Sequence, residues 1–488
     1  MTTPRPTTRP RSWGAAIDET EAHKAWALAE EPDDLPQTAP DESPRRFTMP
    51  VMTIAETRNW TQRLWRAVRK ESPSAVAPRD TYSNDEIAVM LRTLGMAMLE
   101  VGQPVNIVGS RLLTIASRYT TSAVRLAVLP TVIIVKVDTA GAKVDQTDRA
   151  TVRFDQAGKI AAIVELAEAG AIAPDDAVAE VSAARELPRR FGPVTTVFGN
   201  ALATIGFGMM LNPTWAALPA YALLGAVVGS VLVIAPRLPG LVAIQATVSA
   251  LLVTVLAAGF LADVAGDGIL RIIAPPLIAL LPGFSLTTGA IELASGQMIA
   301  GASRLVYGVA QVMLLTGGVL LGVRLVGLPT PQHESALMGE WSLYAAIVVM
   351  ALGMYLYLSA PRGSLIWLVV GLGVALITQN LSSAFLDEAM SGAVGAFVSV
   401  PFAIFASGFR GAPPTTVMLL TAYWGLVPGS LSFMNFAKRA TSNVIDVNTF
   451  QGTGTAVFGI ALGMLIGYSV FLMFTSSRHR GSAAFQAA

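Results

Sequence analysis

The pattern of hydrophobic positions divides the chain into a polar N-terminal part and a long apolar part. Ten apolar segments follow Arg189–Arg190, and most approach the roughly 20 residues that a helix needs to cross a bilayer. They cover residues 193–211, 215–235, 238–261, 269–286, 305–326, 341–358, 365–378, 385–407, 414–429 and 452–474. The seventh segment is short, and prolines interrupt the fourth and the ninth. The pattern predicts a polytopic α-helical membrane protein with about ten transmembrane helices.

The apolar segments repeat at a regular distance. Leu281–Pro282–Gly283 in the fourth segment and Val427–Pro428–Gly429 in the ninth are 146 residues apart. The same offset places the other segments of the first half close to those of the second half. We therefore expect two five-helix repeats, over residues 193–327 and 341–475. An odd number of crossings inverts the second repeat, and many secondary transporters have this architecture, with the substrate between the two halves.

The polar N-terminal part of the chain, before the apolar segments, is predicted to contain a tail, a helix and a small domain. Residues 1–52 are polar and proline-interrupted, which predicts a disordered tail, and residues 53–70 predict a basic amphipathic helix, either on a membrane surface or on its own domain. Residues 84–190 predict a small α+β domain in the cytoplasm, with a regulatory, gating or assembly role. Its expected helices cover 84–101, 107–116, 160–169 and 174–184, and its expected strands cover 123–128, 131–137 and 150–154. We expect residues 476–488 to be a cytoplasmic tail.

Composition narrows the class of protein. Only 16 charged residues lie between 193 and 476, too few to cover a water-facing surface. The chain has no cysteine and three scattered histidines, which argues against a metal site, a cofactor and an enzyme. A net charge of +1 gives no basic footprint for nucleic acid. Eight lysines and arginines on one side of the predicted helices against four on the other side favour both termini in the cytoplasm.

The candidate transport site follows the Pro–Gly pair of the fourth segment. Proline interrupts a helix, and freed backbone groups at membrane depth require protein or a water-filled cavity. The proposed substrate and translocation residues are Pro282, Gly283, Ser285, Thr287, Thr288, Glu292, Asn200, Pro428 and Gly429. Helix N-terminal amides and an acid at such a break suit a zwitterionic amino acid. Small residues also serve simply to let transmembrane helices pack closely.

Proton coupling requires a carboxylate in or near the membrane. The candidates are Glu292, Asp387 and Glu388. Asp387 and Glu388 can equally be a solvated pair at the outer end of the eighth segment. Asn200 can equally form a hydrogen bond between helices.

Residues 280–305, LLPGFSLTTGAIELASGQMIAGASRL, resemble the signature of the threonine/serine exporter family. The matching positions are Pro282, Gly283, Glu292, Leu293, Gly296, Gly301 and Arg304. The family usually has aspartate at the position of Glu292 and commonly a second acid at that of Gln297. The ten-segment layout and the N-terminal domain are similar as well, so the resemblance covers about residues 84–475.

The resemblance implies export of L-threonine and L-serine from the cytoplasm across the bacterial inner membrane, driven by the proton-motive force. The expected partners are therefore a small amino acid and the lipid bilayer, and a homo-oligomer is left open. Three alternatives remain at this point: a channel or passive facilitator, an intramembrane enzyme, and a membrane-anchored scaffold or sensor that acts through its cytoplasmic domain.

Overall fold

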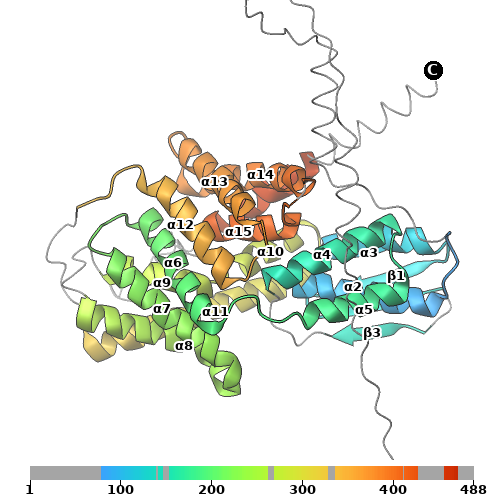
Figure 1. Cartoon of the computed structure of the whole chain (residues 1–488), viewed down its shortest axis with the longest axis horizontal. Coiled ribbons are helices and arrows are strands. Elements are labelled where there is room, and N and C mark those ends of the chain that lie inside the picture. Colours follow the sequence, from blue (N-terminus) through green and yellow to red (C-terminus); the bar gives the residue numbers. More distant parts are fainter. Residues whose placement is uncertain are drawn as a thin grey trace, which may run out of the picture. The chain divides into compact units, whose positions relative to one another are not determined.

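The computed structural model describes residues 78–138, 141–146, 153–261, 269–327, 336–409, 411–426 and 456–470. The predicted tail 1–52, the basic helix 53–70, the second Pro–Gly pair Pro428–Gly429 and the tail 476–488 lie outside these residues. The helices and strands below keep the labels of Figure 1.

An α+β domain forms the first described part of the chain (Figure 1). Its elements are α2 (Asn84–Glu100), α3 (Val105–Tyr119), β1 (Val124–Val128), β2 (Val132–Val137), β3 (Lys143–Gln146), α4 (Phe154–Ala169) and α5 (Pro174–Arg185). The strands pair antiparallel in the order β1-β2-β3. Ile133, Val135 and Val137 alternate along β2 and are buried in the domain's core. Four helices and three strands thus lie in the stretch for which the sequence predicts an α+β unit.

Local sequence fixes the start of α2. The Ser83 hydroxyl accepts from the Glu86 amide, and the Glu86 carboxylate accepts from the Ser83 amide at 2.7 Å, which is a capping box. The hydrogen bonds from Ser83 hold the pKa of Glu86 below its usual value. The far end of α2 is fixed by a buried ion pair, because Arg185 of α5 lies 2.9 Å from the Glu100 carboxylate.

The third strand was predicted in the wrong place. Residues 150–152 of the expected strand are not described, Arg153 is not in a strand, and Phe154 begins α4. The Arg153 amide donates to the Gln156 side chain at 3.0 Å and closes the first turn of that helix. The third strand is Lys143–Gln146, which pairs with β2.

Each of the ten predicted apolar segments overlaps a helix among the described residues, apart from one to three residues at some ends and the break at 281–282. These helices are α6 (Pro193–Leu211), α7 (Leu218–Ile234), α8 (Pro239–Leu256), α9 (Ile269–Leu277), α10 (Gly283–Ala294), α11 (Met298–Val326), α12 (Ser342–Tyr357), α13 (Leu365–Ser382), α14 (Glu388–Ser407), α15 (Thr415–Leu426) and Ala456–Val470. Short extensions follow α7, α8 and α9: η1 (Ala235–Arg237), η2 (Ala257–Leu261) and η3 (Ile278–Leu280). Within the described residues, six helices are long and apolar enough to cross a membrane, or seven when one bent pair counts as a span. The helices Ser342–Tyr357, Thr415–Leu426 and Ala456–Val470 are shorter. The protein is thus a helical membrane protein with six or seven candidate spans among these residues.

The fourth apolar segment is broken where the sequence predicts it. Arg271–Leu280 and Gly283–Ala294 meet at 60°. Pro282 is the residue before α10 and has φ −81° and ψ 32°, outside the helical region. Pro275 and Pro276, in contrast, lie inside α9 without ending it.

The two arms of the broken segment belong to different cores. Ile272 and Leu277 of α9 are buried with side chains of α7, α8 and α11. Leu286 and Ile291 of α10 are buried with side chains of α13, α14, α15 and Ala456–Val470. The bend at Pro282 therefore carries the chain from the core of the earlier helices into that of the later ones.

The α+β domain contacts the turn between α12 and α13. The Phe154 amide donates to the Leu358 carbonyl at 3.0 Å, and the Arg190 guanidinium donates to the Ala360 carbonyl at 2.6 Å. Gly158 lies so close to Pro361 that a Cβ there would be 3.1 Å from its ring. A second contact joins the α2–α3 turn to α10.

Candidate functional site

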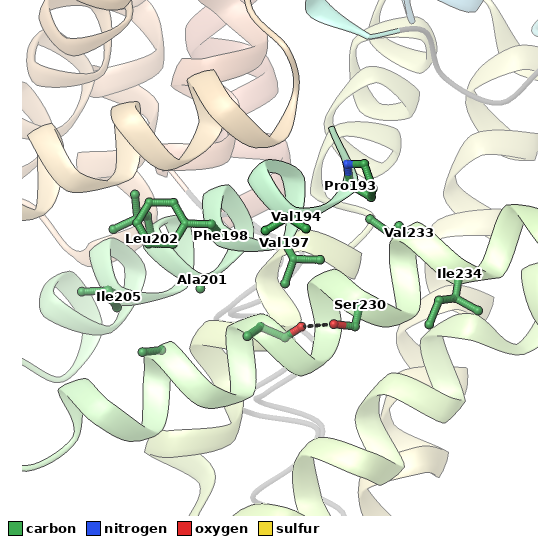
Figure 2. A pocket seen from close by; sticks show the side chains of 12 residues that line it. Pro193, Val194, Val197, Phe198, Ala201, Leu202, Ile205, Ser230, Val233 and Ile234 are labelled. Atoms are coloured by element: carbon green, nitrogen blue, oxygen red, sulfur yellow. Dashed lines mark hydrogen bonds between the residues drawn. The ribbon is translucent and has the colours of Figure 1, made fainter. Parts of the chain in front are cut away.

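A groove between α6 and α7 is the first hollow to consider (Figure 2). It measures about 580 Å³ and is lined by Pro193, Val194, Val197, Phe198, Ala201, Leu202, Ile205, Ala222, Ala226, Ser230, Val233 and Ile234. Its one polar side chain, Ser230, donates its hydroxyl to the Ala226 carbonyl at 2.8 Å. No charged group lines this groove, so it offers nothing to hold a zwitterion.

Charged and hydrogen-bonding groups instead surround Glu292, near the end of α10. This side chain is fully buried. Arg304 of α11 has its Nε atom 3.1 Å from both carboxylate oxygens, and its N–H is directed at Oε1. Removing two charges from water is costly, and leaving one of them unpaired costs more, so each group depends on the other.

The third partner of Glu292 comes from the α+β domain. The Val105 amide donates to Glu292 Oε1 at 3.0 Å. Val105 is the first residue of α3, and the preceding Pro104 has no side chain that can cap the helix. The free amides of a helix N-terminus attract a carboxylate through hydrogen bonding and the helix dipole. Glu292 therefore caps α3 from a different part of the fold.

Gly102 of the α2–α3 turn and the first residues of α3 contact one face of α10 and its C-cap Ser295. Phe284, Glu292 and Ser295 recur at helical spacing on this face. Gly102, with φ +88°, lies against the Phe284 ring, where a Cβ would be 2.5 Å from a ring carbon. The Asn106 side-chain amide donates to the Ser295 hydroxyl at 3.1 Å.

Two hydroxyl groups of α10, five and four residues before Glu292, have hydrogen-bonding capacity to spare. Thr287 and Thr288 are buried, and neither hydroxyl has a hydrogen-bond partner among the described residues. Arg304 Nη2 also has no hydrogen-bond partner there, and Glu292 Oε2 accepts no hydrogen bond although it lies in the ion pair with Arg304 Nε. Buried polar atoms are normally satisfied by protein, ordered water or a ligand. The site therefore has a donor, an acceptor and two hydroxyls available to a small polar molecule.

The glycines of this region serve packing. A Cβ on Gly289 would lie 3.0 Å from the Gly301 carbonyl oxygen, and one on Gly301 would lie 2.7 Å from the Gly289 carbonyl oxygen. A Cβ on Gly308 would lie 2.5 Å from Leu286. These glycines let α10 and α11 approach closely, which brings Arg304 to Glu292.

The other predicted site residues have different surroundings. Pro282 and Gly283 form the break, and Ser285 is half-buried on the first turn of α10. Asn200 of α6 donates its side-chain amide to the Gly225 carbonyl of α7 at 2.7 Å, which is a hydrogen bond between helices.

The two candidate acids outside α10 lie at the start of α14. Asp387 is exposed and accepts from the Met390 amide at 2.8 Å, so it caps that helix. Glu388 is the first residue of α14. Among the described residues, no group of three histidines, cysteines or acids could hold a metal ion.

Several contacts of the site were missed from the sequence. The sequence identified Arg304 as a motif residue and as a charge next to an apolar segment, and not as the partner of Glu292. Val105, Gln103 and Asn106 were missed altogether. The visible signal was the Gly102–Gln103–Pro104 break, which predicts a turn without indicating what the turn contacts.

Comparison with known proteins agrees with the resemblance predicted from the sequence. Residues 89–326 match the model of the ThrE family, described as "Putative threonine/serine exporter". No curated protein and no solved structure matches the chain. The matched part runs from within α2 to the last residue of α11 and includes the α+β domain, the broken helix, Glu292 and Arg304. The resemblance to the threonine/serine exporter family is thus supported by a match to that family's model over residues 89–326.

Proposed function

We propose that this protein exports small hydroxylated amino acids, L-threonine and L-serine, across the bacterial inner membrane in exchange for protons. The family match suggests an exporter rather than an enzyme. The apolar helices suit a membrane protein. In this proposal both termini lie in the cytoplasm, and so does the α+β domain.

One observation carries the proposal: a broken helix joins two cores, and it carries a buried carboxylate paired with Arg304 and two buried hydroxyls without a partner among the described residues. The break lies at Pro282, between the core that contains α9 and the core that contains α10. Secondary transporters place their substrates at such discontinuous helices between two structural halves.

The chemistry of the site suits a hydroxylated α-amino acid. The substrate's ammonium group pairs with the Glu292 carboxylate, and its carboxylate pairs with Arg304, whose Nη2 has hydrogen-bonding capacity left. The Thr287 and Thr288 hydroxyls can donate to or accept from the substrate hydroxyl. An apolar amino acid of similar size would leave these groups unpaired, which disfavours its binding.

Two inverted repeats are part of the proposal. The starts of α6, α7, α8 and α9 precede those of α12, α13, α14 and α15 by 149, 147, 149 and 146 residues. The first helices of the two halves also pack closely, because a Cβ on Gly206 of α6 would lie 2.7 Å from Met350 of α12. We propose that one half rocks against the other about this contact and about the break at Pro282.

Glu292 is the proposed proton carrier. Its carboxylate carries the charge that binds both Arg304 and the Val105 amide. Protonation would remove that charge, weaken both contacts and release a bound ammonium group. Asp387 and Glu388 remain candidates for proton transfer at the end of α14.

Counterflow in proteoliposomes tests the proposal. Purified protein should exchange labelled threonine against threonine or serine, and an imposed pH gradient should drive uphill accumulation. Alanine and valine serve as matched amino acids without a hydroxyl. Absence of counterflow with every amino acid would refute the exporter, and downhill flux alone, unaffected by the pH gradient or by uncouplers, would indicate a passive facilitator.

A further inference from the structure

The α2–α3 turn of the N-terminal domain places two carboxamide side chains on either side of the Glu292 contact. Gln103 precedes Val105 by two residues, and Asn106 follows it. Gln103 is 6% exposed, and its Nε2 donates to the Thr416 hydroxyl of α15 at 3.3 Å. The turn thus contacts α10 and α15 together, by side chains as well as by its backbone.

In each carboxamide the nitrogen donates a hydrogen bond, but the oxygen accepts none within the described part of the chain. Gln103 Oε1 and Asn106 Oδ1 are buried and have no hydrogen-bond partner among the described residues. In the described part of the chain, six of the eight such side-chain atoms belong to this turn or to α10 and α11. That concentration is not expected of a packing contact, since unsatisfied polar atoms are costly and rare.

The side-chain atoms without a hydrogen bond at this site are mostly acceptors. Three are acceptors, namely Gln103 Oε1, Asn106 Oδ1 and Glu292 Oε2, and the one obligate donor is Arg304 Nη2. An ammonium group offers three N–H donors, and a carboxylate accepts from a guanidinium. A zwitterion therefore matches this set, with its ammonium group on the side of the turn.

We infer that Gln103 and Asn106 are substrate-contacting residues that recognise the ammonium group of the transported amino acid. The N-terminal domain is then part of the transport site, and the membrane helices alone would have an incomplete site. This inference rests on the proposed export function and adds two specificity-determining residues to it.

Counterflow kinetics of the full chain test the inference. Gln103→Leu and Asn106→Leu keep approximate size and remove the acceptor. Loss of a hydrogen bond to a charged group should raise the apparent KM for labelled threonine by about tenfold or more, with the maximal rate nearly unchanged.

A structural carboxamide of the same domain gives the matched control. Gln156 is buried, and both its ends are bonded, to the Arg153 amide and the Arg185 carbonyl. Gln156→Leu should reduce the amount of folded protein while leaving the KM of the folded fraction unchanged.

Competition separates recognition of the ammonium group from general damage. Serine and 3-hydroxypropionate, which lacks the ammonium group, are compared as inhibitors of threonine counterflow. In the Leu variants serine should inhibit threonine counterflow less than in the wild type. The difference in inhibition between serine and 3-hydroxypropionate should therefore be smaller. An unchanged KM and an unchanged difference in both variants would overturn the inference while leaving the export function intact. A wild-type protein without counterflow would refute the export function, and this inference with it.

Discussion

The carboxylate of Glu292 caps the helix that begins at Val105, 187 residues earlier in the chain. Glu292 lies near the C-terminal end of α10, where the helix dipole disfavours a negative charge. The N-terminus of α3 and the guanidinium of Arg304 supply the compensating positive charge. One carboxylate therefore links the broken helix, its neighbour α11 and the α+β domain.

Glu292→Gln should destabilise the protein more than a neutral isosteric change usually does. The change leaves the charge of Arg304, whose side chain is 15% exposed, without its partner, and breaking such a pair costs up to about 3–5 kcal/mol. Glu292→Gln/Arg304→Met should recover most of this loss, and thermal unfolding of the purified protein measures both. Transport driven by a pH gradient should be absent from both variants. Wild-type uphill transport by Glu292→Gln would remove this residue from proton coupling.

Gly102→Ala should detach the α2–α3 turn from α10. Its φ of +88° is strained for alanine, and its Cβ would meet the Phe284 ring at 2.5 Å. Gly296→Ala is the matched control, because Gly296 has φ +80° with nothing within 4 Å of a Cβ. Backbone strain costs about 1–3 kcal/mol at either position, so only Gly102→Ala should lose additional stability and raise the KM for threonine. Equal effects of the two changes would show that the contact with Phe284 is unimportant.

The sequence was sufficient for what local pattern determines. The hydrophobic periodicity of α2 and the Ser83 capping box predict that helix, and the Pro282–Gly283 pair predicts the break. Phe154 was misassigned because a run of β-favouring residues precedes it, whereas Gln156 closes a helical turn there. Lys143–Gln146 was missed because a four-residue edge strand with alternating charge has little periodicity.

The site was predictable only in part, and for a physical reason. Glu292 is conspicuous because a carboxylate in an apolar stretch requires a partner. Which residues partner it depends on tertiary contacts: Arg304 lies one helix later, and Val105 belongs to another domain. A backbone amide has no sequence signature, so no reading of residue types could have identified Val105.

Tyr119 should titrate far above an ordinary tyrosine. Burial raises the pKa of Tyr119 to about 12, and its hydroxyl donates to the Ile172 carbonyl at 2.7 Å. Between about pH 10 and 12 the unfolded chain releases this proton while the folded protein keeps it, so stability falls as pH rises through that window. The difference in tyrosinate absorbance between wild type and Tyr119→Phe should have its midpoint near 12, and this variant should lose stability less steeply in the same window. A midpoint near 10 would contradict the burial of the phenol.

Entry of a substrate to Glu292 should require the α2–α3 turn to leave α10, since the carboxylate is fully buried while the turn is bound. The chain contains no cysteine, so introduced pairs can be crosslinked selectively. Asn106→Cys/Ser295→Cys replaces two side chains that lie within a hydrogen bond of each other. A short, reducible bis-thiosulfonate reagent should join them and abolish the counterflow that remains in the single variant Asn106→Cys, and reduction should restore that level.

A second pair distinguishes movement of the turn from movement of the whole domain. Gly158→Cys/Pro361→Cys connects α4 to the turn between α12 and α13, where the same domain contacts the membrane helices away from α10. Crosslinking this pair should leave counterflow largely intact, because the α2–α3 turn can still separate from α10. Equal loss of transport with both pairs would show that the whole domain moves, and full transport with the first pair crosslinked would show that the turn stays in place while substrate enters.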